Sequence, residues 1–164
     1  MRECLKFVLK KGKRQMKNTK KFLALLLCAV MLFCIFGCAP TEDGTSGEIT
    51  VVIAEDPVAK YTVDLDEVSV TNGLISVLEY LKSKEGITFE MSGTMIDKVG
   101  ALTNDYAEGK YIYIYTSVAA DIDVSEYATT VEYEGQTLTS SGVGASDMHI
   151  EGGAIIYIGA ISFG

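Results

Sequence analysis

The run 111–116 (YIYIYT) has the most regular placement of side chains that could bind a ligand. Successive side chains of a strand point to opposite faces, so Tyr111, Tyr113 and Tyr115 should share one face and the isoleucines the other. A tyrosine combines a broad ring with a polar tip, so this row could stack on a flat or glycosidic ligand. The alternative is that the rings cover a half-buried sheet face, as aromatic residues often do in strands.

A second candidate is the Ser/Gly-rich segment 139–146 (TSSGVGAS), which is predicted to be a loop. Ser140 and Ser141 supply hydroxyl groups, and Gly142 lets a backbone approach a ligand closely. The alternative is an ordinary turn between two strands.

Two weaker patterns predict no site. Asp121 and Asp123 begin a stretch spaced like a calcium-binding loop, but Glu126 stands where such a loop needs glycine. We therefore expect an acidic surface loop. His149 is the one histidine of the chain and has no cysteine in the folded part to share a metal, so it is expected to be structural or exposed.

The residue types also argue against catalysis. All four cysteines lie at or before residue 38, so residues 39–164 can form no disulfide. Ser146 lies in Gly-Ala-Ser-Asp-Met, which is not the turn that exposes a nucleophilic serine. We predict that the protein is not an enzyme and has no catalytic residue, resident cofactor or metal.

Charge divides the chain into two parts. Residues 1–37 carry nine Lys and Arg and one acid, a net charge of +8, whereas residues 38–164 carry five Lys, no Arg and 21 acids, a net charge of −16. The acidic part would repel a phosphate backbone, so nucleic acid is excluded as a partner. The same repulsion applies to an anionic lipid surface.

The N-terminal part has the layout of a secretory signal, with a basic run at residues 1–21 and an uncharged, apolar run at 22–37. Sixteen helical residues span about 24 Å, less than the hydrocarbon core of about 30 Å, so removal is favoured over a permanent span. Met16 also precedes a sufficient basic run, so translation could begin there.

The end of the apolar run, Ile35-Phe36-Gly37-Cys38, resembles the bacterial lipobox. The resemblance implies that Cys38 receives a diacylglyceryl group and becomes the first mature residue. An uncleaved N-terminal anchor is the alternative. Both place the rest of the chain on the outer side of the cell membrane. Residues 38–47 are then the lipidated cysteine and a flexible tether, and 48–164 a single folded domain.

The folded part combines strands with one helix. Apolar residues at i, i+3, i+4 and i+7 predict a helix over 73–84, with Asn72 or Thr71 capping its start. The apolar run 154–161 predicts a central strand buried on both faces. This order is α+β, and a β-grasp-like mixed sheet packed on one helix is the economical arrangement. The other predicted strands are 49–53 and 61–65 as a hairpin, 87–91, 111–116, and 130–133 with 136–138 as a second hairpin.

These segments together resemble a known family. The strand ITVVI, the helix VTNGLISVLEYL, and the segments GITFEMSG, IDKVGAL, GKYIYIY and SSGVGASDMHIEGG are similar to the transcobalamin-like C-terminal domain of extracellular bacterial proteins. The resemblance covers about residues 48–163. It implies a β-grasp fold and, as one version, a corrinoid ligand at the loop 139–146.

Two functions follow from these patterns. The first is a surface-tethered, non-catalytic module that binds a small molecule or an extracellular partner. The second is a structural or adhesive envelope module that contacts protein or glycan by a sheet edge or the tyrosine face. A concave pocket lined by the tyrosines and the loop 139–146 would favour the first, and a continuous surface the second.

Overall fold

A computed structural model describes residues 45–163, which form an α+β domain. The predicted signal segment, the lipidated Cys38 and the tether up to residue 44 lie outside the described residues. Within 45–163, no helix is long and apolar enough to cross a membrane.

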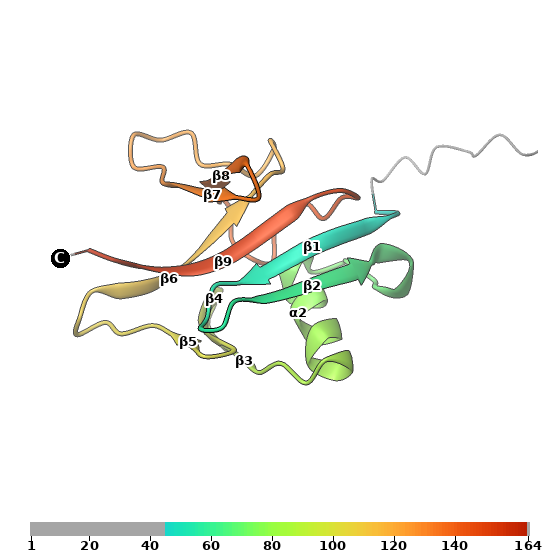
Figure 1. Ribbon diagram of the computed structural model, residues 1–164, viewed down its shortest axis with the longest axis horizontal. Helices are drawn as coiled ribbons and strands as arrows, with labels where there is room; N and C mark the ends of the chain where they lie inside the picture. Colours follow the sequence, from blue (N-terminus) through green and yellow to red (C-terminus); the bar gives the residue numbers. More distant parts are fainter. Residues whose placement is uncertain (1–44, 164) are drawn as a thin grey trace, which may run out of the picture. The chain divides into compact units, whose positions relative to one another are not determined.

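The domain opens with the predicted hairpin and helix. β1 (Glu48–Ile53) pairs antiparallel with β2 (Ala59–Asp64), and a short 3-10 helix (Leu65–Glu67) follows. The helix α2 spans Gly73–Lys84, as predicted, because its apolar stripe packs on the sheet. Figure 1 shows α2 on one side of the six-stranded sheet.

The expected capping side chain is not used at the start of α2. Asn72 is the N-cap residue, but its side chain makes no capping hydrogen bond. The N–H of Leu74 instead donates to the carbonyl of Ala145 at 2.8 Å. Gly73 has a φ of +52°, and a Cβ there would lie 2.6 Å from the same carbonyl oxygen. The loop after residue 140 is thereby held against the helix.

The main sheet has the strand order β2-β1-β9-β6-β8-β7. β9 (Ile155–Ser162) is central, as predicted, lying parallel to β1 and antiparallel to β6 (Lys110–Thr116). The prediction that β9 is buried on both faces is wrong. Ile156 and Ile158 are fully buried toward α2, but Ile155 and Tyr157 on the other face are only half-buried.

A second, three-stranded sheet was not predicted beyond its first strand. It consists of β3 (Phe89–Ser92), β4 (Met95–Val99) and β5 (Leu102–Thr103). The segment 95–102 shows no clear alternation because Met95 is exposed whereas Ile96 and Val99 face the core. Its strands form by pairing with one another and by burying these two side chains.

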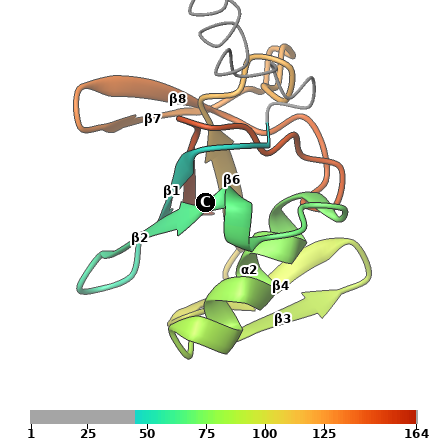
Figure 2. The same ribbon diagram turned by 90° about the vertical axis from the view of Figure 1, so that its right-hand side faces the viewer.

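The second predicted hairpin is present and leans over one face of the main sheet. It comprises β7 (Thr130–Tyr133) and β8 (Gln136–Ser140), and β8 pairs with β6 only at Tyr115 and Thr116. Figures 1 and 2 place this hairpin on the side of the sheet away from α2. Its turn reaches β2, where Glu134 forms a 2.8 Å ion pair with Lys60.

Candidate functional site

The three predicted tyrosines belong to a longer row of aromatic rings. Tyr113 packs on Tyr115 at a centroid distance of 6.4 Å and on Phe163 at 5.9 Å. Further contacts of 5.8 to 6.0 Å extend the row at both ends. We define the aromatic row as the seven residues Tyr106, Tyr111, Phe163, Tyr113, Tyr115, Tyr157 and Tyr133.

The aromatic row runs over the face of the main sheet that does not carry α2. Tyr106 and Phe163 at one end are 57% and 56% exposed, and Tyr111, Tyr113, Tyr157 and Tyr133 are half-buried. Tyr115 is buried under the hairpin, 4% exposed, with its hydroxyl near that of Thr129. Tyr115 therefore covers the sheet, as the alternative expected, whereas Tyr111 and Tyr113 remain partly accessible and their role as ligand contacts stays a prediction.

An ion pair closes the hairpin end of the row. The Nζ of Lys60 lies 5.8 Å from the ring centroid of Tyr133 as well as 2.8 Å from Glu134. Their hydrogen bond raises the pKa of Lys60 and lowers the pKa of Glu134. Both side chains are about half exposed, so solvent screens their attraction and the pair adds little to stability. It positions the hairpin without fixing it strongly.

The predicted loop begins two residues later than expected. Thr139 and Ser140 belong to β8 because they pair with Thr116 and Tyr115 of β6. Ser140 is buried, and its hydroxyl accepts a hydrogen bond from the N–H of Thr129 at 3.0 Å. Its prediction as a ligand contact stays untested, but this hydroxyl already has a structural partner.

Ser141 and Gly142 lie at the start of the remaining loop. The hydroxyl of Ser141 donates to the carbonyl of Val143 at 2.9 Å, which tightens the turn. Gly142 is exposed, but a Cβ there would lie 3.1 Å from the Cα of Asp123. The close approach of the two loops thus favours glycine at 142, whether or not a ligand binds.

A groove lies on the other side of the sheet from the aromatic rings. It has a volume of about 190 Å³, and its walls come from β4, β6 and the loop 141–145. Ser141 and Tyr113 both line it, but the ring of Tyr113 packs on Phe163 and Tyr115, on the opposite face of β6. The expected single pocket of tyrosines and loop is therefore divided into two separate surfaces.

Four members of the aromatic row escaped the sequence analysis. Tyr157 meets Tyr115 because β9 and β6 pair in the register that sets these residues opposite each other. Tyr133 and Phe163 come from other elements, and Tyr106 from the turn before β6. Alternation within β9 predicts that Tyr157 shares a face with Ile155. The pairing of Tyr157 with Tyr115 depends on the register between β9 and β6, which the sequence pattern does not show.

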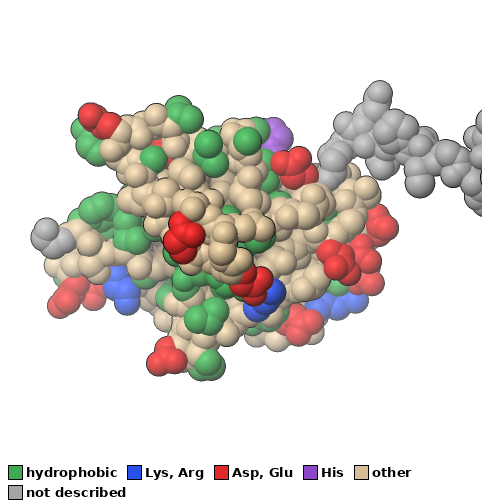
Figure 3. All heavy atoms as spheres, turned by 45° about the horizontal axis from the view of Figure 1, so that its top comes forward, with side chains coloured by type: hydrophobic (Ala, Val, Ile, Leu, Met, Phe, Trp, Pro, Cys, Tyr) green, Lys and Arg blue, Asp and Glu red, His purple; other side chains and the backbone are tan. Residues whose placement is uncertain are grey.

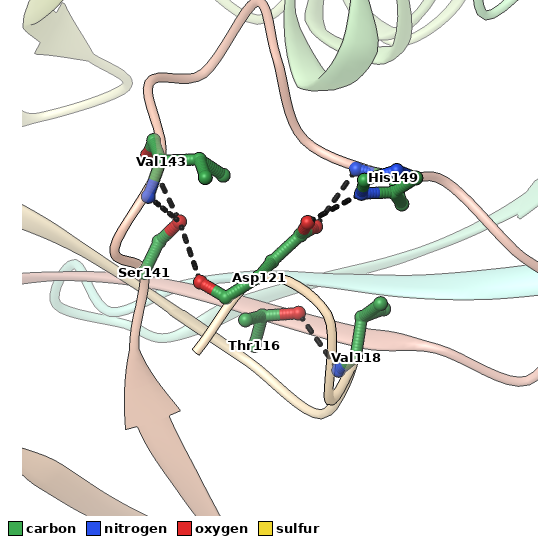
Figure 4. A network of polar contacts seen from close by, with 6 residues as sticks. All are labelled: Thr116, Val118, Asp121, Ser141, Val143 and His149. Atoms are coloured by element: carbon green, nitrogen blue, oxygen red, sulfur yellow. Dashed lines mark hydrogen bonds and ion pairs between the residues drawn. The ribbon is translucent and has the colours of Figure 1, made fainter. Parts of the chain in front are cut away.

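A buried carboxyl group forms the third feature. Asp121 is fully buried, so its prediction as part of an acidic surface loop is wrong. The main-chain N–H of His149 donates to Oδ2 of Asp121, with 2.7 Å between the nitrogen and the oxygen. The ring Nδ1 of His149 lies 2.6 Å from Oδ1 of the same carboxyl group. Figure 4 shows this pair beside the contacts of Ser141 and Thr116. The imidazole is exposed, as Figure 3 shows in purple.

The pair makes stability depend on pH. The hydrogen bond that the imidazole donates to the Asp121 carboxylate, aided by the charge of that carboxylate, raises the pKa of His149 above its usual value. The charged imidazole is favoured in the folded state, so its contribution to stability is complete below the unfolded pKa of about 6.5 and is lost as pH rises through the folded pKa.

His149→Ala should therefore lower the melting temperature more at pH 5.5 than at pH 9. An equal loss at both pH values would contradict this assignment.

The described residues show no group arranged as a metal site, and their one acid–histidine pair does not contact a hydroxyl group. Among residues 45–163, no three His, Cys, Asp or Glu side chains are grouped so that they could hold a metal ion. Asp121 and His149 form an acid–histidine pair, but the hydroxyl of Ser141 contacts the main chain of Asp121 and Val143 and not the imidazole. The aromatic row and the groove are two accessible features of the domain.

Comparisons with known proteins identify no family. No family model and no curated protein matches the chain. A solved structure described as that of "a putative metal binding protein" from Ruminococcus gnavus is similar to 73% of this chain and to 100% of that chain. The two are 14% identical, with a TM-score of 0.46. A likeness this low carries no argument about function.

Proposed function

We propose that this protein is a lipid-anchored, outward-facing binding module without catalytic activity, and that its ligand lies along the aromatic row. The division of the expected pocket into two surfaces supports the second predicted function, contact with a glycan along the tyrosine face, over a pocket for a small molecule. The anchor is Cys38, after a signal segment at 1–37, and residues 38–47 are the tether. The fold we propose is a β-grasp of the transcobalamin-like type. The parallel pairing of β1 with β9, flanked by β2 and β6 and crossed by α2, supports that fold.

The observation that carries the proposed function is the run of accessible rings at the open end of the aromatic row. Tyr106, Tyr111, Phe163 and Tyr113 follow one another at centroid distances of 5.8 to 6.0 Å, and all four are half-buried or exposed. A tyrosine in contact with a sugar packs its ring on the apolar face and offers its hydroxyl to the sugar hydroxyls. An extended, neutral, polyhydroxylated ligand such as a glycan strand matches this surface.

Charge supports the same choice of ligand. The folded part carries 21 acids and five lysines within residues 38–164, so a polyanionic ligand would be repelled. Lys60, which lies beside the row, is already paired with Glu134. A neutral ligand avoids both the repulsion and the loss of this ion pair.

A corrinoid held by the loop is less well supported. The groove beside the loop measures about 190 Å³, below the roughly 300 Å³ at which pockets for drug-sized ligands begin. It could enclose only part of a large planar ring. Hydroxocobalamin is therefore a comparison ligand in the experiment below.

Tyr113→Ala should weaken binding of cellohexaose or chitohexaose by about 1–3 kcal/mol, about 5- to 150-fold in Kd. The ring at the centre of the row and one hydroxyl contact are both lost. Calorimetric titration of the full chain in lipid nanodiscs measures the affinity. The chain contains no tryptophan, so tyrosine fluorescence provides an independent readout.

The matched control is Tyr127→Ala, because Tyr127 is 78% exposed and is not a member of the row. It should leave the affinity unchanged. Tyr113→Phe should retain most of the stacking and lose the hydroxyl contact only. If Tyr113→Ala lowers the melting temperature but leaves the affinity of the folded protein unchanged, the row is structural. Binding of hydroxocobalamin but of neither oligosaccharide would instead favour the corrinoid version.

A further inference from the structure

The groove between β4 and β6 contains a free edge of β6. Ile112, Tyr113 and Ile114 all line it, although successive side chains of a strand point to opposite faces. Three consecutive residues can share one groove when the main chain itself forms its wall. β9 pairs along the other edge of β6, and β8 pairs only with Tyr115 and Thr116.

Hydrogen bonds on both sides define the length of this free edge. The N–H of Ile112 donates to the side-chain oxygen of Asn104 at 2.6 Å. The carbonyl of Ile114 accepts from the N–H of Ser141 at 2.7 Å. In an antiparallel ladder the N–H and C=O of one residue point to the same edge. The carbonyl of Ile112 and the N–H of Ile114 therefore point away from β9 too.

These two groups have no hydrogen-bond partner among residues 45–163. They lie between the two bonds just described, one acceptor and one donor on the same strand edge. An open strand edge with a free donor and a free acceptor is a template for pairing with another chain. The walls beside them are mainly apolar, with Met95 and Val143 at 51% and 36% exposure.

We propose that this groove binds an extended peptide segment of a partner protein, by strand addition to β6. In a parallel pairing, one residue of the peptide donates its N–H to the carbonyl of Ile112 and accepts at its C=O from the N–H of Ile114. Apolar side chains of the peptide then contact Met95 and Val143. The site is separate from the aromatic row and does not depend on the function proposed for it.

The orientation of the two groups favours a peptide over a ligand with one amide. In a trans amide the N–H and C=O point in opposite directions, so a single acetamido group cannot satisfy both on one edge. In an extended peptide, the N–H and C=O of one residue point to the same side. The groove volume of about 190 Å³ also suits a few side chains better than a large ligand.

The probe is the neutral peptide acetyl-Thr-Val-Ile-Val-Thr-amide, titrated into the full chain in lipid nanodiscs. The nanodisc accommodates the uncharged run 22–37 without free detergent, which would compete for an apolar groove. The amide signal of Ile114 should shift downfield and become protected from hydrogen exchange.

Two N-methylated copies of the probe serve as controls. One carries the methyl group on the nitrogen of its central isoleucine, and the other on the nitrogen of the valine that follows. These two nitrogens lie on opposite edges of the extended peptide. One copy should bind at least tenfold more weakly, and the other should bind like the probe.

Two variants separate the groove from the rest of the domain. Val143→Trp should fill the groove and weaken the probe at least tenfold at an unchanged melting temperature. Val124→Trp is the control, because Val124 is 90% exposed and does not line the groove. The proposal is wrong if the probe does not bind at millimolar concentration, if both N-methylated copies bind alike, or if the shifted amides lie on the aromatic row and not at Ile114.

Discussion

Leu78→Ala is expected to lower the free energy of unfolding by about 2–5 kcal/mol, the range for deleting a large buried aliphatic side chain. Leu78 is fully buried at the middle of α2, in the core shared with β1 and β9. The backbone of the helix and sheet cannot close the resulting cavity. Urea unfolding of the variant and the wild type measures the difference.

Glu79→Ala is the matched control, because Glu79 lies next to Leu78 on the exposed side of α2. It should change the free energy of unfolding by at most about 0.5 kcal/mol. A loss for Leu78→Ala within this same range would mean that the stripe of α2 does not support the sheet. Since many domains have only about 5–15 kcal/mol in total, the expected loss could unfold this one at 37 °C.

Cys38→Ala is expected to abolish lipid labelling completely and to leave the precursor uncleaved. In the proposed anchor, the modified Cys38 would carry the acyl chains and mark the cleavage site of the lipobox-like segment 35–38. Two acyl chains are sufficient for stable anchoring, so the variant should also lose its processed, lipid-held form. Metabolic labelling with a fatty acid, followed by N-terminal analysis, measures both effects.

Cys34→Ala provides the comparison, because Cys34 follows Phe33 and lacks the small residue that the lipobox pattern places before its cysteine. It should label and mature like the wild type. Maturation of Cys38→Ala to the same N-terminus would remove the basis for the anchor. The proposed outward location of residues 45–163 would then lose its support.

The sequence predicted those parts of the fold that depend on local periodicity. The stripe through Leu74, Val77, Leu78 and Leu81 gave the bounds of α2, because burial along one side of a helix repeats every 3.6 residues. The alternation at 111–116 predicted β6 and the common face of its tyrosines. Each of these signals lies within a dozen residues, so no partner strand had to be known.

The sequence did not predict strands that depend on their partners. β4 and β5 have weak patterns of their own and exist through pairing with each other and with β3. The start of the loop was also missed, because Thr139 and Ser140 have loop-like neighbours but pair with β6. Local propensity was outweighed there by main-chain hydrogen bonds to a distant strand.

The composition of each surface was decided by the tertiary structure alone. Register brings Tyr157 to Tyr115, and the turn of β7 and β8 brings Glu134 to Lys60 across 74 residues of sequence. The carboxyl group of Asp121 is buried because the loop before β9 returns to supply His149 as its partner. The free edge of β6 arises where β8 departs from it after two residue pairs. The sequence determined the faces of single elements, whereas contacts between elements depend on strand register and chain reversal, which local periodicity does not encode.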